Sequence, residues 1–226
     1  MSESSSIVFV VDDDASIRAA IASLLRSAGL HVQSFDSARE FLASAATHTP
    51  RPACLVLDVH LPDTSGLELQ RELADAGVRM PIVFITGHGD IPTTVRAMKA
   101  GAVEFLAKPF LDHELLGAIE EALVGAAAAQ QEWTEGVALR ARLAQLTKRE
   151  RDVFELVVAG RLNKQIAGEL GITEVTVKIH RARVMQKMQA GSLADLVRMA
   201  ARLEAPGGLQ PQPYQSHQTR DHTKVW

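Results

Sequence analysis

The stretch that most constrains the fold is Cys54–Asp58, where four apolar residues run directly into a single carboxylate. A loop that contains Pro62 and Gly66 follows at once. An uninterrupted apolar run of this length indicates a strand buried on both faces of a parallel sheet. Ligands of open α/β sheets bind at the carboxyl ends of the strands, so Asp58 is a candidate site residue. Aspartate also begins many turns, and this segment alone leaves both interpretations open.

Further apolar runs of this kind occupy the first half of the chain, separated by amphipathic helical patterns. The expected strands span residues 7–11, 31–35, 54–58, 82–86 and 103–107. The expected helices span residues 15–28, about 37–42, 65–76, 91–100 and 112 onward. This alternation predicts an α/β fold with a doubly wound, five-stranded parallel sheet, because right-handed crossovers join consecutive strands.

Polar side chains with complementary chemistry follow four of these strands: Asp12, Asp13, Asp58, Thr86 and Lys108. Parallel strands end at one edge of the sheet, so we expect these side chains to converge. Three close carboxylates repel one another unless a cation intervenes, and Mg²⁺ is the hard cation that carboxylate oxygens suit. Phosphoryl transfer needs such a metal, a nucleophile and a cation. We interpret Asp58 as the nucleophile, Asp12 and Asp13 as metal anchors, Lys108 as counter-charge and Thr86 as a hydrogen-bond donor.

Four motifs surround these residues: Val-Val-Asp12-Asp13, Leu-Asp58-x-x-Leu-Pro62-Asp63-x-x-Gly66, Thr86-Gly-His-Gly and Lys108-Pro109. With them, residues 7–125 resemble the receiver domain of two-component response regulators. The resemblance implies a flavodoxin-like fold and phosphorylation of Asp58 by a sensor histidine kinase. It also implies that Asp13, Asp58 and the backbone carbonyl of His60 hold Mg²⁺ directly, while Asp12 acts through water.

The resemblance assigns roles to three further residues. Lys108 and Thr86 would contact the phosphoryl group, and the Lys108–Pro109 bond would be cis, which proline makes accessible. Phe105 lies where the family often has a tyrosine or another aromatic residue that acts as a rotating switch. A plain core phenylalanine is the alternative, and without a hydroxyl Phe105 could report phosphorylation only by packing.

An enzyme of the haloacid dehalogenase type is the alternative for the acidic site, since it also uses an aspartate at a strand end. Such phosphatases need a second aspartate two positions further on as general acid. This chain has His60 at that position, and we therefore expect a protein that is not an enzyme.

Charge is distributed unevenly along the chain. Residues 1–125 contain 9 Lys and Arg against 17 Asp and Glu, a net charge of −8. Residues 140–200 contain 12 against 6, a net charge of +6. This asymmetry indicates a nucleic-acid-binding module joined to a different one. Two solvated surfaces of opposite sign would give the same values, so charge alone leaves both interpretations open.

The basic half shows several helix starts. Thr147 and Glu150 form a capping box, and Asn163 and Thr173 are expected to cap the next two helices. A short glycine turn separates these two, and the second, residues 174–188, is the more basic. This arrangement predicts a helix-turn-helix. A helical bundle with an ordinary charged face is the alternative.

The second helix of this pair supplies the expected DNA contacts. The candidates for reading base edges in the major groove are Lys178, Ile179, Ala182 and Arg183. The candidates for phosphate contacts are Lys164, Thr173, Arg181 and Lys187.

Three motifs support this interpretation: Leu146-Thr147-x-Arg149-Glu150, Asn163-Lys164-x-Ile166-Ala167 and Thr176-Val177-Lys178-x-His180. With them, residues 147–203 resemble the LuxR-type output domain of FixJ/NarL-type regulators, and we count Thr176 among the DNA contacts. Within the family, the chain is most similar to regulators of aromatic-compound catabolism.

Four segments are expected: a receiver at 5–125, a helical linker at 126–144, a LuxR-type helix-turn-helix domain at 145–204 and, from its Pro, Gly and Gln content without an apolar pattern, a disordered tail at 205–226. The alanine-rich residues 112–145 would suit a long helical linker, a helix pair or a partly mobile hinge, and the sequence leaves these alternatives open. The implied partners are a sensor histidine kinase, promoter DNA, RNA polymerase and, on phosphorylation, a second copy of the chain. Transcriptional activation is the expected outcome. A phospho-signal protein whose helical half binds protein instead of DNA is the alternative. The lone Cys54 and the lack of a bilayer-spanning apolar run predict a cytoplasmic protein without membrane contacts.

Overall fold

The structure is a computed structural model that describes residues 6–44, 49, 51–87 and 91–204. The tail predicted at 205–226 lies outside the described residues. Contacts within the chain group the described residues into two compact units that meet at residues 130 and 131. The domain limits given above stay predictions.

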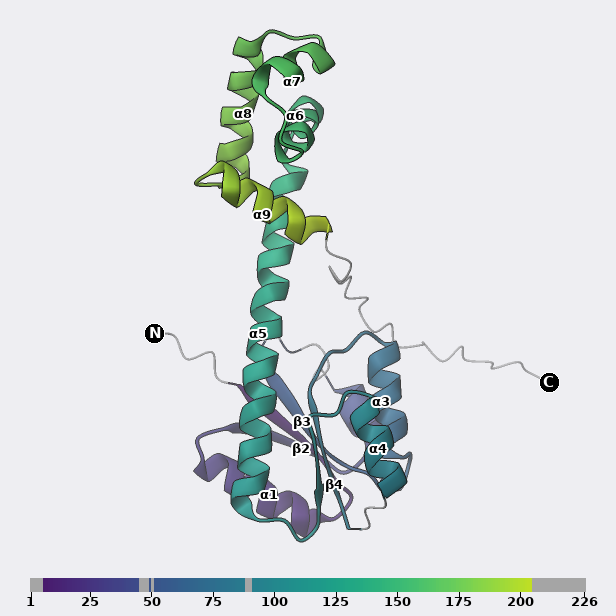
Figure 1. The fold of residues 1–226 in the computed structure, drawn as a ribbon. Coiled ribbons are helices and arrows are strands. Elements are labelled where there is room, and N and C mark those ends of the chain that lie inside the picture. Colours follow the sequence, from purple (N-terminus) through teal and green to yellow (C-terminus); the bar gives the residue numbers. More distant parts are fainter. Residues whose placement is uncertain (1–5, 45–48, 50, 88–90, 205–226) are drawn as a thin grey trace, which may run out of the picture. The chain divides into compact units, whose positions relative to one another are not determined.

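The first unit contains a five-stranded parallel sheet in the order β2-β1-β3-β4-β5 (Figure 1). The strands are β1 (Ile7–Val11), β2 (His31–Phe35), β3 (Ala53–Asp58), β4 (Ile82–Thr86) and β5 (Glu104–Ala107). Every residue of β1, β3 and β4 is buried, as their continuous apolar runs require. The predicted α/β fold with a doubly wound parallel sheet is confirmed.

The strand register brings the site residues together. Val11 of β1 pairs with Leu57 of β3. Asp12 and Asp58 each stand one residue further along, so they emerge from neighbouring strands at the same edge. In β5, Ala107 pairs with Thr86 at the end of β4, which brings Lys108 to that edge as well.

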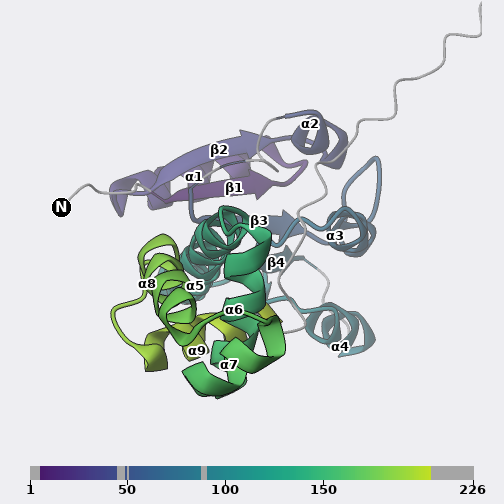
Figure 2. The same cartoon turned by 90° about the horizontal axis from the view of Figure 1, so that it is seen from above.

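Helices cover both faces of the sheet (Figure 2). They are α1 (Ala15–Ser27), α2 (Ala38–Ala43), α3 (Gly66–Asp75), α4 (Ile91–Lys99) and α5 (Asp112–Ala144). Buried residues of α1 and α5 pack on one face with Val8, Val10 and Val56, and those of α2, α3 and α4 pack on the other with Phe9, Leu55 and Leu57. Because side chains alternate along a strand, each central strand contributes to both cores.

The capping residues explain where the helices begin. The Asp14 carboxylate accepts hydrogen bonds from the backbone N–H groups of Ser16 and Ile17, and Ser65 forms a capping box with Glu68. Gly29 follows α1 with a φ of +80°, a left-handed conformation that glycine adopts readily.

The second unit is helical, with α6 (Lys148–Val158), α7 (Asn163–Leu170), α8 (Glu174–Met188) and α9 (Leu193–Glu204), together with the end of α5 (Figure 1). Its core contains Leu146, Val153, Phe154, Ile166, Val177, Val184, Met188 and Leu196. Thr147 and Glu150 form the predicted capping box of α6, and the Thr173 hydroxyl caps α8 by accepting from the Thr176 N–H. The predicted helical C-terminal half is confirmed.

The prediction that Asn163 caps α7 is wrong. Asn163 is the first residue of α7, and Leu162 occupies the cap position. The Leu162 N–H donates to Gln165 Oε1 at 2.9 Å, while Asn163 Oδ1 accepts from Arg181 Nη1 at 2.8 Å. The Asn163 amide therefore binds the neighbouring helix and is not available to its own helix end.

The segment predicted as a linker at 126–144 belongs to α5, which runs without interruption from Asp112 to Ala144. Gly125 and Gly136 lie within this helix and do not break it. None of the helices in the described part of the chain is both long and apolar enough to cross a bilayer.

Candidate functional site

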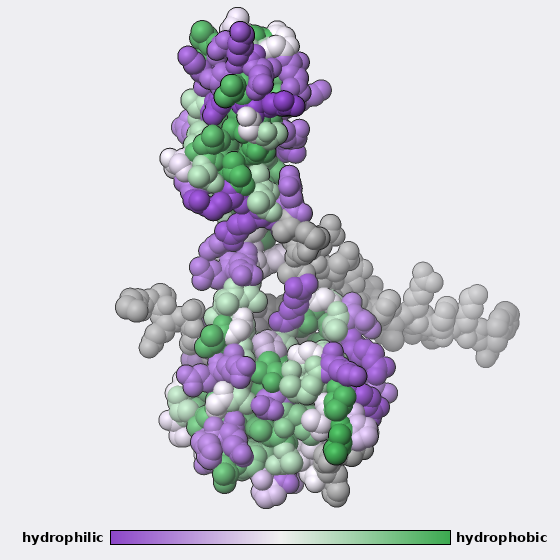
Figure 3. Space-filling model, viewed as in Figure 1, coloured by the Kyte–Doolittle hydropathy of each residue, from purple (hydrophilic) through white to green (hydrophobic). Residues whose placement is uncertain are grey.

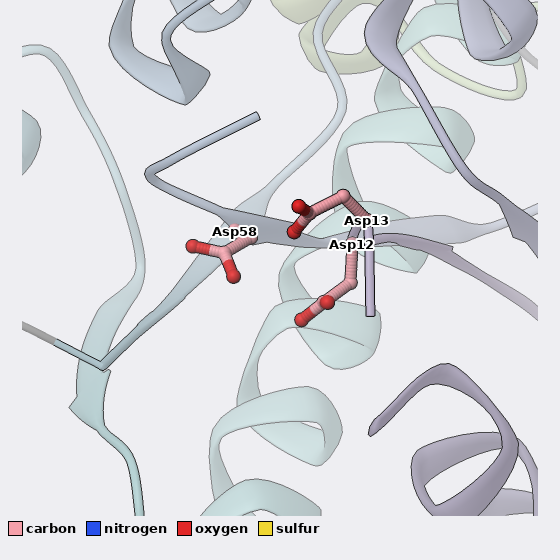
Figure 4. A group of neighbouring side chains, drawn as sticks. All are labelled: Asp12, Asp13 and Asp58. Carbon is pink, nitrogen blue, oxygen red and sulfur yellow. The ribbon is translucent and has the colours of Figure 1, made fainter. Parts of the chain in front are cut away.

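Three carboxylates meet at the carboxyl edge of the sheet (Figure 4). One oxygen from each of Asp12, Asp13 and Asp58 lies within 4.8 Å of the others. Asp12 is completely buried, Asp58 is 6% exposed and Asp13 is exposed. Together with Lys108 and His60 they line an open pocket. The sequence predicted each of these five residues for this site, and the structure places all of them there.

Lys108 joins two of the carboxylates. Its Nζ lies 2.6 Å from Asp12 Oδ2 and 2.6 Å from Asp58 Oδ2, with the lysine side chain 15% exposed. Burial lowers the pKa of Lys108, but its hydrogen bonds to Asp12 and Asp58 outweigh burial, so the pKa lies above its usual value. The ammonium is therefore charged at physiological pH and can neutralise an oxyanion beside Asp58.

Burial is the largest influence on the pKa of Asp12. It raises the pKa of this carboxyl above its usual value, although the hydrogen bond from Lys108 and the backbone N–H of Asp14 act in the opposite direction. One ammonium faces three carboxylates, so negative charge remains in excess at the pocket. A divalent cation with oxygen ligands would remove that excess, and the donor set therefore fits Mg²⁺.

Backbone contacts fix the loops that carry these carboxylates. Arg18 Nη1 donates to the Asp12 carbonyl at 2.6 Å, and the His60 N–H donates to Asp58 Oδ1 at 3.0 Å. Gly66 packs directly on β3, since a Cβ there would lie 2.3 Å from the Asp58 carbonyl oxygen. The Lys108–Pro109 bond is cis, as predicted.

Thr86 and Phe105, the two further residues predicted for this site, are not among the residues that line the pocket. The Thr86 side chain is fully buried, and its Oγ1 lies 3.4 Å from Nδ1 of the His60 ring. The half-buried Phe105 packs against Phe84, with ring centroids 6.1 Å apart. Their predicted roles at a phosphoryl group and in a switch stay predictions.

On α8, the candidates for base contacts share one exposed face. Val177, Val184 and Met188 point into the core, which leaves Lys178, Ile179, Ala182 and Arg183 exposed. The turn before α8 passes through Gly171 with a φ of +65°. The arrangement of α7, turn and α8 is that of a helix-turn-helix, whose second helix is the one that enters the major groove.

The four residues predicted to contact DNA phosphates differ in exposure and in the contacts that they already make within the protein. Lys164 and Thr173 are exposed, whereas Arg181 is half-buried and donates to Asn163. Lys187 Nζ lies 2.6 Å from Glu150 Oε2 and donates to the Gln145 carbonyl at 3.1 Å. These contacts favour an internal role for Lys187 over a phosphate contact.

Comparison with known proteins agrees with both units. Residues 8–120 match the response regulator receiver domain, and residues 144–200 match the bacterial regulatory proteins of the luxR family. The fold and site thus define a receiver joined to a LuxR-type DNA-binding domain, and the chain belongs to the response regulators that regulate transcription.

Particular relatives share this organisation over nearly their whole length. Nodulation protein W of Bradyrhizobium diazoefficiens is 52% identical over 87% of this chain and 86% of its own. Transcriptional regulatory protein FixJ of Rhizobium meliloti is 47% identical over 90% and 97%. The structure of the response regulator StyR, 51% identical, superposes with a TM-score of 0.79 over 88% of this chain and 99% of that one.

Proposed function

We propose that a sensor histidine kinase phosphorylates Asp58 in a Mg²⁺-dependent reaction, and that the phosphorylated chain dimerises on promoter DNA and activates transcription with RNA polymerase. We also propose that the protein acts in the cytoplasm, because that is where its DNA target would lie. The observation that carries the proposal is the contact of Lys108 with both Asp58 and Asp12, in an open pocket whose acidic groups exceed its cations.

The three clustered carboxylates, Lys108 and His60 would each have a separate part in phosphoryl transfer. A carboxylate oxygen of Asp58 attacks phosphorus as the bond from phosphorus to the kinase histidine breaks, which forms an acyl phosphate. Lys108 balances the charge of the phosphoryl oxygens. Asp13, Asp58, the His60 carbonyl and, through water, Asp12 would hold Mg²⁺, which when bound supplies further charge neutralisation.

The same geometry supports a phosphoacceptor over a phosphatase. A hydrolase of the haloacid dehalogenase type would need a carboxylic acid two residues after Asp58, and the exposed side chain there is His60. We therefore propose that turnover is not the function and that the acyl phosphate is the signal.

The dimer face that we propose consists of α4, β5 and the start of α5. Hydrophobic side chains gather on α4 (Figure 3), where Ile91 is 80% exposed and Val95 and Met98 are each more than 40% exposed. Phe105 lies within β5, and Thr86 ends β4, the strand that pairs with β5. A phosphoryl group that accepts a hydrogen bond from the Thr86 hydroxyl would change the packing of Phe105. This change would favour the conformation of the face that dimerises.

Phosphoryl uptake tests the acceptor. The full chain is incubated with Mg²⁺ and labelled acetyl phosphate, alongside Asp58→Asn and the control Asp75→Asn at the exposed end of α3. We expect label on the wild type and on Asp75→Asn but none on Asp58→Asn. Equal labelling of Asp58→Asn would show that the acceptor lies elsewhere.

A protein-docking role for the helical unit is the second candidate, because α8 also exposes the apolar Val175 and Ile179. Such a unit would bind DNA negligibly and without dependence on salt, whereas a DNA-binding unit loses affinity as salt rises.

A further inference from the structure

The loop between β3 and α3, residues 59–65, is held at three points. At its start the His60 N–H donates to the Asp58 carboxylate, and at its end the Gly66 N–H donates to the Val59 carbonyl at 2.9 Å. His60 and Ser65 also pair as an isolated antiparallel bridge. The third point is the tip, where Asp63 contacts a helix that lies far away in the sequence.

Asp63 binds the first turn of α2. Its Oδ2 accepts from the Arg39 N–H at 2.9 Å, and its Oδ1 accepts from the Ala38 N–H at 3.4 Å. These two N–H groups open α2 and have no partner within the helix, so a carboxylate is the group that suits them best. Burial raises the pKa of Asp63, but the hydrogen bonds from Arg39 and Ala38 outweigh it and the pKa lies below its usual value.

The helix that receives Asp63 is firmly anchored. Ala38 and Phe41 are 1% and 0% exposed. The Phe41 ring lies 5.8 Å from that of Phe9 and 5.4 Å from that of Phe35, both edge-on, so α2 is fixed to β1 and β2. A loop tip tied to this helix takes its position from the hydrophobic core. Without Asp63, the loop would lose its hydrogen bonds to α2 and would keep the contacts at its two ends, the packing of Leu61 on the core and the contact of the His60 ring with Thr86.

From these contacts we infer that Asp63 is a positioning residue for the metal site: by tying the tip of the β3–α3 loop to α2, it fixes the backbone carbonyl of His60 toward the pocket. This inference rests on the proposed Mg²⁺-dependent function. Asp63 itself touches neither the metal nor the phosphoryl group, and it acts through the orientation of the loop. Residues that orient the ligands of a metal contribute strongly to metal affinity.

Magnesium affinity of the full chain tests the inference, with Mg²⁺ titrated by calorimetry. Asp63→Ala removes both hydrogen bonds to α2, and we expect about a 10-fold weaker affinity. Asp63→Asn keeps an oxygen that can accept from the Arg39 N–H, and its affinity should lie between those of Asp63→Ala and the wild type. Such a rescue separates loop positioning from loss of charge.

Asp36→Ala is the matched control. Asp36 is an exposed aspartate beside the same end of α2, but its carboxylate accepts from the Ser37 hydroxyl and makes no bond to the loop. This variant removes the same charge from the same neighbourhood, and we expect wild-type Mg²⁺ affinity. If Asp63→Ala and Asp36→Ala bind Mg²⁺ equally well, the inference is wrong.

Hydrogen exchange of single amides provides a readout that a general loss of stability would not reproduce. In Asp63→Ala we expect faster exchange at Arg39 and His60, with unchanged exchange in β1 and β4. Faster exchange throughout the sheet would mean that Asp63 only stabilises the fold, which overturns the inference. A wild-type chain that binds no Mg²⁺ would instead refute the proposed function.

Discussion

At the scale of single residues, the pocket depends on a balance between burial and pairing. A buried carboxylate such as Asp12 is costly unless a cation lies beside it, and the lysine after β5 supplies that cation. This balance explains why the chain can keep an ionised cluster at the edge of a hydrophobic sheet. It also makes Lys108 important to the stability of the pocket, since its ammonium pairs with both Asp12 and Asp58.

We predict that Lys108→Ala destabilises the first unit by about 3 kcal/mol in the absence of Mg²⁺, because it leaves Asp12 buried without its partner. Adding Mg²⁺ should recover more stability in the variant than in the wild type, since the cation takes over part of the compensation. Urea unfolding with and without Mg²⁺ measures both effects, and Lys99→Ala, an exposed lysine of α4, is the control. An equal response of wild type and variant to Mg²⁺ would contradict the prediction.

In the second unit, Glu150 provides a prediction of pH dependence. Its hydrogen bonds with Lys187 and with the Thr147 N–H lower its pKa from 4.5 to about 2. Because the folded state has the lower pKa, this carboxylate stabilises the fold fully above pH 4.5 and loses its contribution as the pH falls to about 2. Glu150→Gln should remove this dependence from acid unfolding followed by circular dichroism, whereas Glu155→Gln, exposed on the same helix, should retain it.

The site residues that follow strands could be predicted from sequence, because the end of a buried strand fixes where the next side chain lies. Asp12, Asp58 and Lys108 are of this kind. The part played by Asp63 could not be predicted, since its partners, Ala38 and Arg39, precede it by more than twenty residues. The pattern of residues carries no signal for a contact between a loop tip and a distant helix end.

At the scale of elements, the partners of the capping side chains explain which helix starts were predicted correctly and why the predicted cap at Asn163 was wrong. Asp14, Ser65, Thr147 and Thr173 each accept a hydrogen bond from a backbone N–H group in the first turn of the helix that follows. Asn163 looked equivalent in sequence, but a guanidinium from α8 occupies its oxygen. The continuous course of α5 was also left open by the sequence, because glycines weaken a helix without ending it.

Gly66 begins α3 and packs against the backbone of Asp58 in the pocket. We predict that Gly66→Ala lowers both the stability of the fold and phosphoryl uptake. The new Cβ would lie 2.3 Å from the Asp58 carbonyl oxygen, so β3 or the start of α3 must shift. Thermal unfolding and Mg²⁺-dependent phosphoryl uptake should both decline.

The matched control for this substitution is Gly125→Ala in α5, where a Cβ would meet nothing within 4 Å. A helical alanine there should raise stability by about 0.5 to 1 kcal/mol and leave phosphoryl uptake unchanged. If Gly66→Ala behaved like Gly125→Ala, close packing against Asp58 would not be required.

At the scale of the whole molecule, the chain joins an acidic receiver to a basic DNA-binding domain. The uneven charge along the sequence corresponds to this division, since residues 1–125 carry a net charge of −8 and residues 140–200, which contain the helix-turn-helix, carry +6. The family comparisons establish both modules. The central claim that remains for experiment is that the acyl phosphate on Asp58 controls binding to DNA.

The most direct test measures the affinity of the full chain for fluorescent duplex DNA of random sequence across a range of salt concentrations, before and after incubation with acetyl phosphate and Mg²⁺. We predict that phosphorylation raises the affinity of the wild type but not of Asp58→Asn. We also predict that the logarithm of the binding constant falls linearly with the logarithm of salt concentration. Equal DNA affinity of the phosphorylated and unphosphorylated wild type would contradict the account.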